Sequence, residues 1–398
     1  MSYLHLAVAL DGAGWHPAAW RDPSSRAEEL FTGRYWADLV TEAERGLLDF
    51  VTFEDALAPA TGESLTGDRR AGIARGRLDA ILLATRVAPI TSHIGLVAAT
   101  DVTHSEPFHI STGIASLDFA SLGRAGWRPR VSPRPDHAAR FGRRTLPGLT
   151  REDFRDLAAS PAAVELFAEA SDAIEVVRRL WDSWEDDAEI RDVATSRFLD
   201  RDKLHYIDFD GPQFSVRGPS ITPRPPQGQP LVTVLAHAHL PYELAVRGAD
   251  IVYVTPRSRS HLDAILTEIA TIREANGRNG LEPIRVFSDL VVFLDDEPGA
   301  AAQRKTRLDE IDGTPLSSDA AVFAGTPSEL ADLLVNWRLA GLDGFRLRPG
   351  LLPYDLTTIT TALVPELQRR GAFRESYEAD TLRGLLRLPR PENRYATN

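Results

Sequence analysis

The chain has 398 residues, of which 43% are hydrophobic and 26% charged, a composition typical of a globular protein that buries a large core. Its 57 acidic and 45 basic residues give a formal net charge of -12, which would repel a phosphate backbone and argues against a nucleic-acid partner. The chain has no cysteine, which excludes disulfide bonds, thiolate nucleophiles, cysteine-ligated zinc and iron-sulfur clusters.

The first residues predict a strand rather than a targeting segment. Residues 4–10 are apolar but have no basic leader before them, and no stretch approaches the ~20 apolar residues that span a bilayer. We therefore expect a cytoplasmic protein without membrane contact. The loop after this strand carries His16 and Trp20, and in a barrel it would lie at the C-terminal rim, where active sites are built.

An amphipathic helix over residues 35–46 leads to a strand over residues 50–53, which ends in Glu54 and Asp55. An acid at the carboxyl end of a parallel strand lies where ligands bind, although it can also cap the next helix or pair with an arginine. Asp55 is therefore a candidate site residue.

Residues 94–100 form an apolar run rich in Ile, Val and Ala, the pattern of a strand buried on both faces of a parallel sheet. Near its end, a small residue such as Ala98 would let a flat ring approach the backbone; the alternative is that the alanines only fill the core. The dipeptide Glu106-Pro107 then favours a helix start, and another strand begins at Ala125. Ligands of α/β folds bind where such strands end.

Strand and helix patterns alternate along the rest of the chain. Strands are expected over residues 231–235, 249–254, 285–294 and 344–347, and helices over residues 161–184, 261–276, 300–311, 328–340 and 354–369. No Gly-x-Gly-x-x-Gly follows the first strand, which favours a barrel over a dinucleotide-binding sheet. We predict a single (β/α)8 TIM-barrel domain over residues 1–398. Insertions are expected at its C-terminal rim near residues 128–160 and 184–230, with a shortened lid near residues 312–323.

Two groups of polar residues remain open to interpretation. His237 and His239 follow the strand at residues 231–235, but two histidines without a clear third ligand are weak evidence for zinc, and we predict no metal site. Arg346 and Arg348, at the last strand, either bind an anionic substrate or pair with nearby acids, and the sequence favours neither.

A family resemblance rests on the run EPFHISTGIASLDFASLGRAGW at residues 106–127 and on the segments 175–230 and 324–395. These residues closely resemble the bacterial luciferase-like flavin monooxygenases, in the branch of the nitrilotriacetate, sulfone and long-chain alkane monooxygenases. The resemblance implies an oxidoreductase in which FMN, reduced by a separate flavin reductase, reacts with O2 to oxygenate a small organic substrate. It also implies a homo-oligomer.

The resemblance assigns roles to individual positions. It makes His16 the candidate catalytic acid or base. The cofactor-binding candidates are Asp55, Ala98, Thr100 and Arg128 on the side of the flavin ring, and His237 and Ala238 on the side of its phosphate.

The chain departs from the family pattern at several cofactor contacts. Relatives carry asparagine at the position of Arg128, and they have a Gly-x-Ser-x-x-Gly-like phosphate turn where this chain has Ala238 and Pro241, the latter without an N-H to donate. These departures leave two alternatives beside the monooxygenase. One is a flavin-poor paralogue that acts as a binding protein or a non-catalytic partner subunit; the other is an F420-dependent oxidoreductase.

Overall fold

The computed structural model describes residues 3–57, 72, 74, 76–278 and 284–396. Parallel strands form a closed barrel in the order β10-β9-β4-β3-β2-β1-β13-β11, and pairing of β10 with β11 closes it. The strands are β1 His5–Leu10, β2 Phe50–Phe53, β3 Gly95–Asp101, β4 Ala125–Arg130, β9 Leu231–Leu235, β10 Ile251–Val254, β11 Arg285–Leu294 and β13 Gly344–Pro349. The predicted (β/α)8 barrel is confirmed.

A further strand, β12 Ala321–Gly325, extends the sheet beside β11. The first residues of β11 pair with β10 up to Ser288, and its last residues, from Leu290 onward, pair with β12. This strand occupies part of the predicted lid near residues 312–323, so only a short loop remains between it and the preceding helix.

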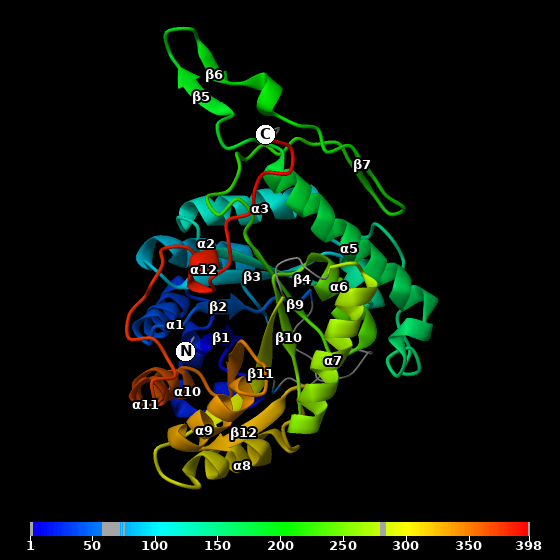
Figure 1. Ribbon diagram of the computed structural model, residues 1–398. Coiled ribbons are helices and arrows are strands. Elements are labelled where there is room, and N and C mark those ends of the chain that lie inside the picture. The colour runs from blue at the N-terminus through cyan, green and yellow to red at the C-terminus, as the bar shows by residue number, and fades with distance from the viewer. Residues whose placement is uncertain (1–2, 58–71, 73, 75, 279–283, 397–398) are drawn as a thin grey trace.

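Helices surround the barrel on its outside (Figure 1). They are α1 Gly33–Arg45, α2 Ala80–Val87, α3 Pro107–Ala120, α5 Pro161–Asp182, α6 His239–Gly248, α7 Arg259–Ala275, α8 Ala300–Asp312, α9 Pro327–Arg338, α10 Tyr354–Thr358 and α11 Val364–Arg369. Side-chain caps fix several starts: Thr32, Ser160 and Ser258 each accept a hydrogen bond from a first-turn N-H. A π-helical segment, Ile359–Leu363, joins α10 to α11 in the place of the single helix expected over residues 354–369.

The strands divide the core into two layers with the period of two expected for strands. Residues such as Leu96 and Trp127 pack against the helices, whereas the alternate residues Ala7, Phe50 and Val97 fill the lower barrel. The list of inward residues also contains Leu382, Leu386 and Leu388, from the short helix α12 Leu382–Leu385 and the residues after it. The C-terminal segment thus closes the N-terminal end of the barrel.

Glycines make room for this plug. A Cβ atom at Gly95 would lie 2.5 Å from Leu382 Cδ1 and 2.8 Å from Phe50 Cβ, and one at Gly126 would lie 2.7 Å from Val97 Cγ2. Both positions therefore exclude a larger side chain, and the open end of the barrel is the carboxyl end.

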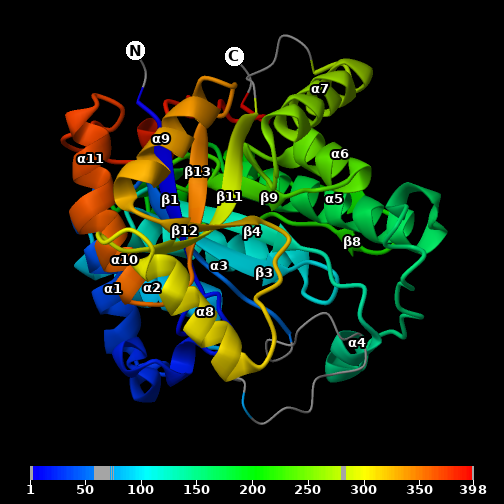
Figure 2. The ribbon, with the colours of Figure 1, turned by 90° about the horizontal axis from the view of Figure 1, so that it is seen from below.

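The two predicted insertions lie at opposite ends. Residues 131–160 include α4 Pro135–Phe141, which Figure 2 shows beyond the carboxyl ends of the strands. Residues 183–230 instead connect the end of α5 to the start of β9, which places them at the N-terminal end rather than at the rim. They form two hairpins, β5 Glu189–Asp192 with β6 Arg197–Leu199 and β7 Phe209–Asp210 with β8 Ser215–Val216. No helix in the described part of the chain is long and apolar enough to cross a membrane.

Candidate functional site

Charged residues replace apolar ones in the upper half of the barrel. Ala7 and Phe50 point into the barrel near its N-terminal end. On β2 the same inward face continues to Glu54 at the carboxyl end. On β13 it includes Arg346, which is paired in register with Ala7 of β1 and Asp289 of β11. Period-two alternation brings Arg128 of β4 to the same interior. Four strands, β2, β4, β11 and β13, therefore direct charges toward one axis at the open end.

The two arginines of the last strand are fully committed to acids. Asp289 Oδ1 accepts a hydrogen bond of 2.8 Å from Arg346 Nε, and Asp289 Oδ2 accepts one of 2.9 Å from Arg348 Nε. Arg346 also contacts Glu54 at 3.1 Å, and Arg348 contacts Asp319 at 2.6 Å. Both guanidinium groups are buried, so the structure favours acid pairing over binding of an anionic substrate.

Arg128 and Glu54 form a buried pair at the centre of the mouth. Burial alone would raise the pKa of Glu54, but the charges of Arg128 and Arg346 hold it at about 2. Burial lowers the pKa of Arg128 to about 10, so it stays protonated at neutral pH. Its Nη2 donates to Glu54, while its Nε is buried and has no hydrogen-bond partner in the part of the chain that the structure describes. This orphaned donor is free to meet a ligand acceptor.

Two adjoining cavities open at this end of the barrel. The mouth cavity, about 340 Å³, lies over the strand ends and is lined by residues that include Trp15, Arg128, Leu235, Arg346 and Arg348. The side cavity, about 240 Å³, lies under the rim insertion and is lined by residues that include Asp55, Leu57, Asp101, Ser132 and Phe154. The residues that line both are Ala56, Arg130, Arg134 and His137. These four residues mark the junction of the two cavities.

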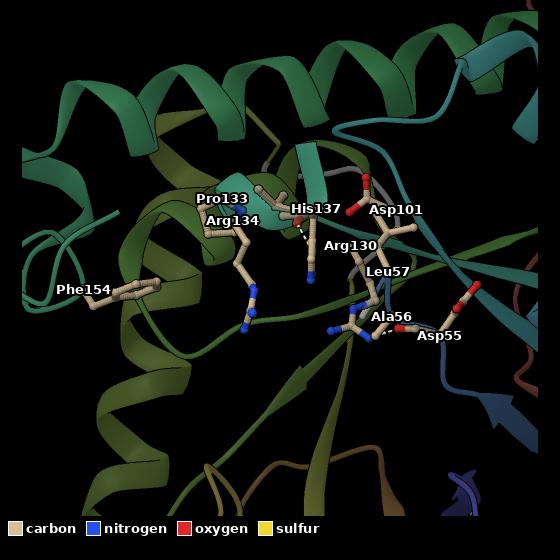
Figure 3. Close-up of a pocket in the computed structure, with 11 residues that line it drawn as sticks. Asp55, Ala56, Leu57, Asp101, Arg130, Pro133, Arg134, His137 and Phe154 are labelled. Atoms are coloured by element: carbon tan, nitrogen blue, oxygen red, sulfur yellow. Dashed lines mark hydrogen bonds between the residues drawn. The ribbon is translucent and has the colours of Figure 1, made fainter. Parts of the chain in front are cut away.

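His137 is the most confined polar side chain of the junction. Its Nδ1 lies 2.5 Å from Ser132 Oγ, while its Nε2 is buried and has no hydrogen-bond partner among the described residues. Burial lowers its pKa to about 4, so the imidazole is neutral at neutral pH. Figure 3 shows its ring between the side chains of Arg130 and Arg134.

The carboxylates of the side cavity are weak acids for their type. Burial raises the pKa of Asp101 to about 6, although its Oδ1 accepts a 2.8 Å hydrogen bond from the backbone N-H of His104. Burial also raises the pKa of Asp55, whose backbone carbonyl accepts a hydrogen bond from Arg130. The side cavity therefore holds one carboxyl group, that of Asp101, which exchanges a proton close to neutral pH.

Of the predicted cofactor residues, Asp55 lines the side cavity and Arg128 the mouth cavity, but Ala98 and Thr100 face the helices. Ala98 lies in the outer hydrophobic layer, paired in register with Trp127, and the Thr100 hydroxyl accepts a 2.7 Å hydrogen bond from the indole N-H of Trp127. The strand ends beside the side cavity, but the side chains of Ala98 and Thr100 lie on its outer face. Asp101, one residue further on, reaches the side cavity instead.

His16 is held away from both cavities. Its Nε2 lies 3.0 Å from Asp309 Oδ1, and its Nδ1 accepts a 3.1 Å hydrogen bond from the N-H of Ala18. Both ring nitrogens are thus occupied, and the side chain is fully buried. These contacts tie the first loop to α8 and do not support the acid-base role, which stays a prediction.

The predicted phosphate residues lie at the start of α6, outside the linings of the two cavities. Ala238 is the N-cap residue and supplies no side-chain hydrogen bond, and His237 is exposed. His239 pairs with Glu268 at 3.1 Å. Among the described residues, no three His, Asp or Glu side chains form a group that could hold a metal ion.

Two site residues were missed in the sequence: Arg130 and His137. The sequence could have identified Arg130, because residues two apart in a strand lie on the same face and Arg128 was already a candidate. His137 lies in a segment without periodic pattern, and nothing local distinguishes it from a surface residue.

Comparison with known proteins identifies the family. Residues 13–339 match the model described as luciferase-like monooxygenase. The chain belongs to the luciferase-like monooxygenase family. Its relatives include N-acetyl-S-(2-succino)cysteine monooxygenase of Bacillus subtilis (strain 168) and nitrilotriacetate monooxygenase component A of Aminobacter aminovorans. Each is 30% identical over 99% of this chain and 98% of the relative. The solved structure of EDTA monooxygenase from Chelativorans sp. BNC1 has a TM-score of 0.79 at 22% identity and covers 98% of this chain and 99% of that one.

Luciferase-like monooxygenases of this branch use a reduced flavin, and this membership supports the monooxygenase over both alternatives. The mouth cavity fits such a group in one respect that the structure shows. Arg128 lines this cavity, and its Nε is a buried donor without a hydrogen-bond partner among the described residues; a flavin ring presents carbonyl oxygens and ring nitrogens as acceptors. The substituted arginine can therefore take the place of the asparagine that relatives carry there.

Proposed function

We propose that this luciferase-like monooxygenase uses reduced FMN, delivered by a separate flavin reductase, to insert one oxygen atom of O2 into a small organic substrate. The observation that carries the proposal is the unsatisfied Nε-H of Arg128 on the mouth cavity of a barrel of this family. The bound flavin would supply the electrons that activate oxygen, and the protein would position it and exclude water.

The chain's own residues hold the cofactor and its surroundings in place. Arg128 would donate from Nε to the flavin ring, while its pair with Glu54 keeps the guanidinium fixed. The backbone N-H groups at the start of α6, near Ala238, would meet the phosphate, because a helix N-terminus favours an anion.

The site also controls protons and water. Asp101, with a pKa of about 6, can hold or release a proton at its carboxylate inside the side cavity. The loop before β12 is tied down on one side of the mouth, since Asp319 pairs with Arg348 and the N-H of Leu316 donates to Asp309 at 2.8 Å. This closure limits the entry of water from that side.

Anaerobic titration tests the cofactor assignment. We expect micromolar binding of reduced FMN, measured by calorimetry, with oxidised FMN and reduced F420 binding more weakly. Preference for F420 would support the F420-dependent oxidoreductase, and failure to bind any of the three at micromolar concentration would support the flavin-poor paralogue. With a flavin reductase, NADH and ¹⁸O2, one labelled oxygen atom is expected in the product.

The variant Arg128→Lys tests the proposed contact. Lysine keeps a positive charge beside Glu54 but lacks the Nε-H, so we expect about ten-fold weaker binding of reduced FMN, as for the loss of one charged hydrogen bond. The matched control is Arg140→Lys, at an exposed position of α4. Equal FMN affinity in Arg128→Lys and the control would contradict the contact.

We also propose that the protein forms a homo-oligomer, as the resemblance implies. Light scattering after size-exclusion chromatography measures the mass directly. A mass of a single 43.8 kDa chain would contradict this proposal.

A further inference from the structure

We propose that Arg130 and His137 form an oxyanion-binding subsite at the junction of the two cavities, which recognises a carboxylate or sulfonate group of the substrate. The inference rests on the proposed function, because it assigns the substrate class of the same site. Neither residue belongs to the cofactor contacts derived above.

Arg130 differs from the neighbouring arginines, because its charge acts on Glu54, Asp55 and Asp101 without a direct ion pair among the described residues. Arg128, Arg346 and Arg348 each form an ion pair with an acid, and so does Arg77 with Asp11 at 2.9 Å. Among the described residues, Arg130 forms no ion pair. Its one hydrogen bond runs to the backbone carbonyl of Asp55, so most of the donors of its guanidinium remain for a ligand.

His137 supplies a second donor beside it. When the Ser132 hydroxyl donates to Nδ1, the ring proton of the neutral imidazole lies on Nε2. That Nε2 is buried and none of the described residues is its hydrogen-bond partner, and the side chain is only 8% exposed. A group this confined and unsatisfied on the wall of two cavities indicates that an acceptor is missing.

The chemistry of the junction selects an oxyanion. A guanidinium and an imidazole N-H are donors without acceptor capacity in this state, and a carboxylate or sulfonate offers several oxygens in the geometry that a guanidinium prefers. Arg134 lines the same junction, but its charge is paired with Asp136 at 2.9 Å, so Arg130 and His137 are the donors that the proposal uses. A cation or a second hydrogen-bond donor would be repelled here.

The side cavity shapes the rest of the substrate. Asp55 and Asp101 disfavour a second anionic group there, while Leu57 and Phe154 provide apolar walls. The favoured ligand therefore has one oxyanion at the junction and an apolar body, or one with hydrogen-bond donors, in the side cavity.

The flavin phosphate offers the same chemistry from another source, so the test includes both. Hexanoate, 1-hexanesulfonate and hexanamide are titrated into the flavin-free protein and into protein saturated with FMN, and FMN is compared with riboflavin. We expect both anions to bind at least ten-fold more tightly than the neutral amide in each case. Equal binding of hexanoate and hexanamide would overturn the proposal.

Variants locate the subsite. Arg130→Gln and His137→Ala are each expected to weaken binding of 1-hexanesulfonate at least ten-fold. Arg201→Gln, at an exposed position at the opposite end of the barrel, is the unchanged control. Arg130→Lys keeps the positive charge but loses the paired N-H donors of the guanidinium, so it should retain part of the affinity. Residual binding by this variant would show that the site still folds. Arg130 is half-exposed at the end of β4, and thermal melting of each variant checks folding.

Two outcomes separate this inference from the proposed function. A loss of FMN affinity in Arg130→Gln with unchanged riboflavin affinity would assign Arg130 to the flavin phosphate and overturn the substrate subsite. Selective anion binding by a protein that binds no flavin would support the subsite and contradict the monooxygenase.

Discussion

Glu54 carries a negative charge between two buried arginines, and its protonation links pH to stability. Its pKa is held at about 2 in the folded protein, below its ordinary value of 4.5. A carboxyl group with a depressed folded pKa contributes stability that is present above its unfolded pKa and is lost as pH falls through the folded pKa. The contribution of Glu54 therefore disappears between about pH 4.5 and pH 2.

The variant Glu54→Gln measures this contribution. Removing one member of a buried ion pair leaves Arg128 uncompensated, so we expect a loss of about 3–5 kcal/mol in the free energy of unfolding at pH 7. Urea denaturation from pH 7 to pH 2.5 should also show a shallower decline of stability below pH 4.5 than in the unaltered protein. Glu310→Gln, on the exposed side of α8, is the control. An unchanged pH dependence in Glu54→Gln would contradict the assignment.

Asp101 predicts a pH dependence of ligand binding. Burial raises its pKa to about 6, and the groups that act on it include Arg130, Arg144 and the N-H of His104. Above pH 6 its charge opposes an anion in the neighbouring subsite, while the imidazole of His137, with a pKa of about 4, stays neutral.

Binding of 1-hexanesulfonate, which remains ionised, should therefore tighten several-fold from pH 8 to pH 5. Asp101→Asn should remove this pH dependence and bind the sulfonate tightly at both values. Calorimetry at the two pH values measures the effect. A pH dependence that persists in Asp101→Asn would assign it to another group.

At the scale of elements, the C-terminal segment acts as a plug for the barrel. Leu382 of α12 is fully buried among inward residues of the strands, next to Gly95 and Gly126, which have no side chains to fill that space. The plug and the candidate site lie at opposite ends of the same barrel, so stability and ligand binding should respond to separate substitutions.

Leu382→Ala tests this separation. The cavity left by truncation of a buried leucine should lower the free energy of unfolding by about 2–5 kcal/mol, whereas affinity for reduced FMN should change little. Leu339→Ala, at a residue that is 76% exposed, is the matched control. Urea denaturation and flavin titration of the same preparations give both quantities. A stability equal to that of the control would contradict the plug.

At the scale of the whole molecule, the net charge of -12 hides a local positive junction. Acids outnumber bases over the chain, yet arginines of β4 and the rim insertion meet where the two cavities join. Partner classes inferred from net charge alone exclude extended polyanions but say nothing about a small anion, because field and desolvation at a cavity depend on a few nearby groups.

The sequence by itself determined the barrel and its family. Apolar runs such as residues 231–235 and 285–294 indicate buried strands from their composition alone. The family motif at residues 106–127 is a continuous stretch of sequence, so it can be recognised without a structure. The tertiary structure alone decided which polar groups meet. Glu54, Arg128 and Arg346 come together only when the barrel closes in one register. The side chain of Ala98 faces the helices, because the actual alternation of β3 differs by one residue from the expected one. Local patterns encode which residues are buried, whereas the partners of buried charges are set by strands far apart in the chain.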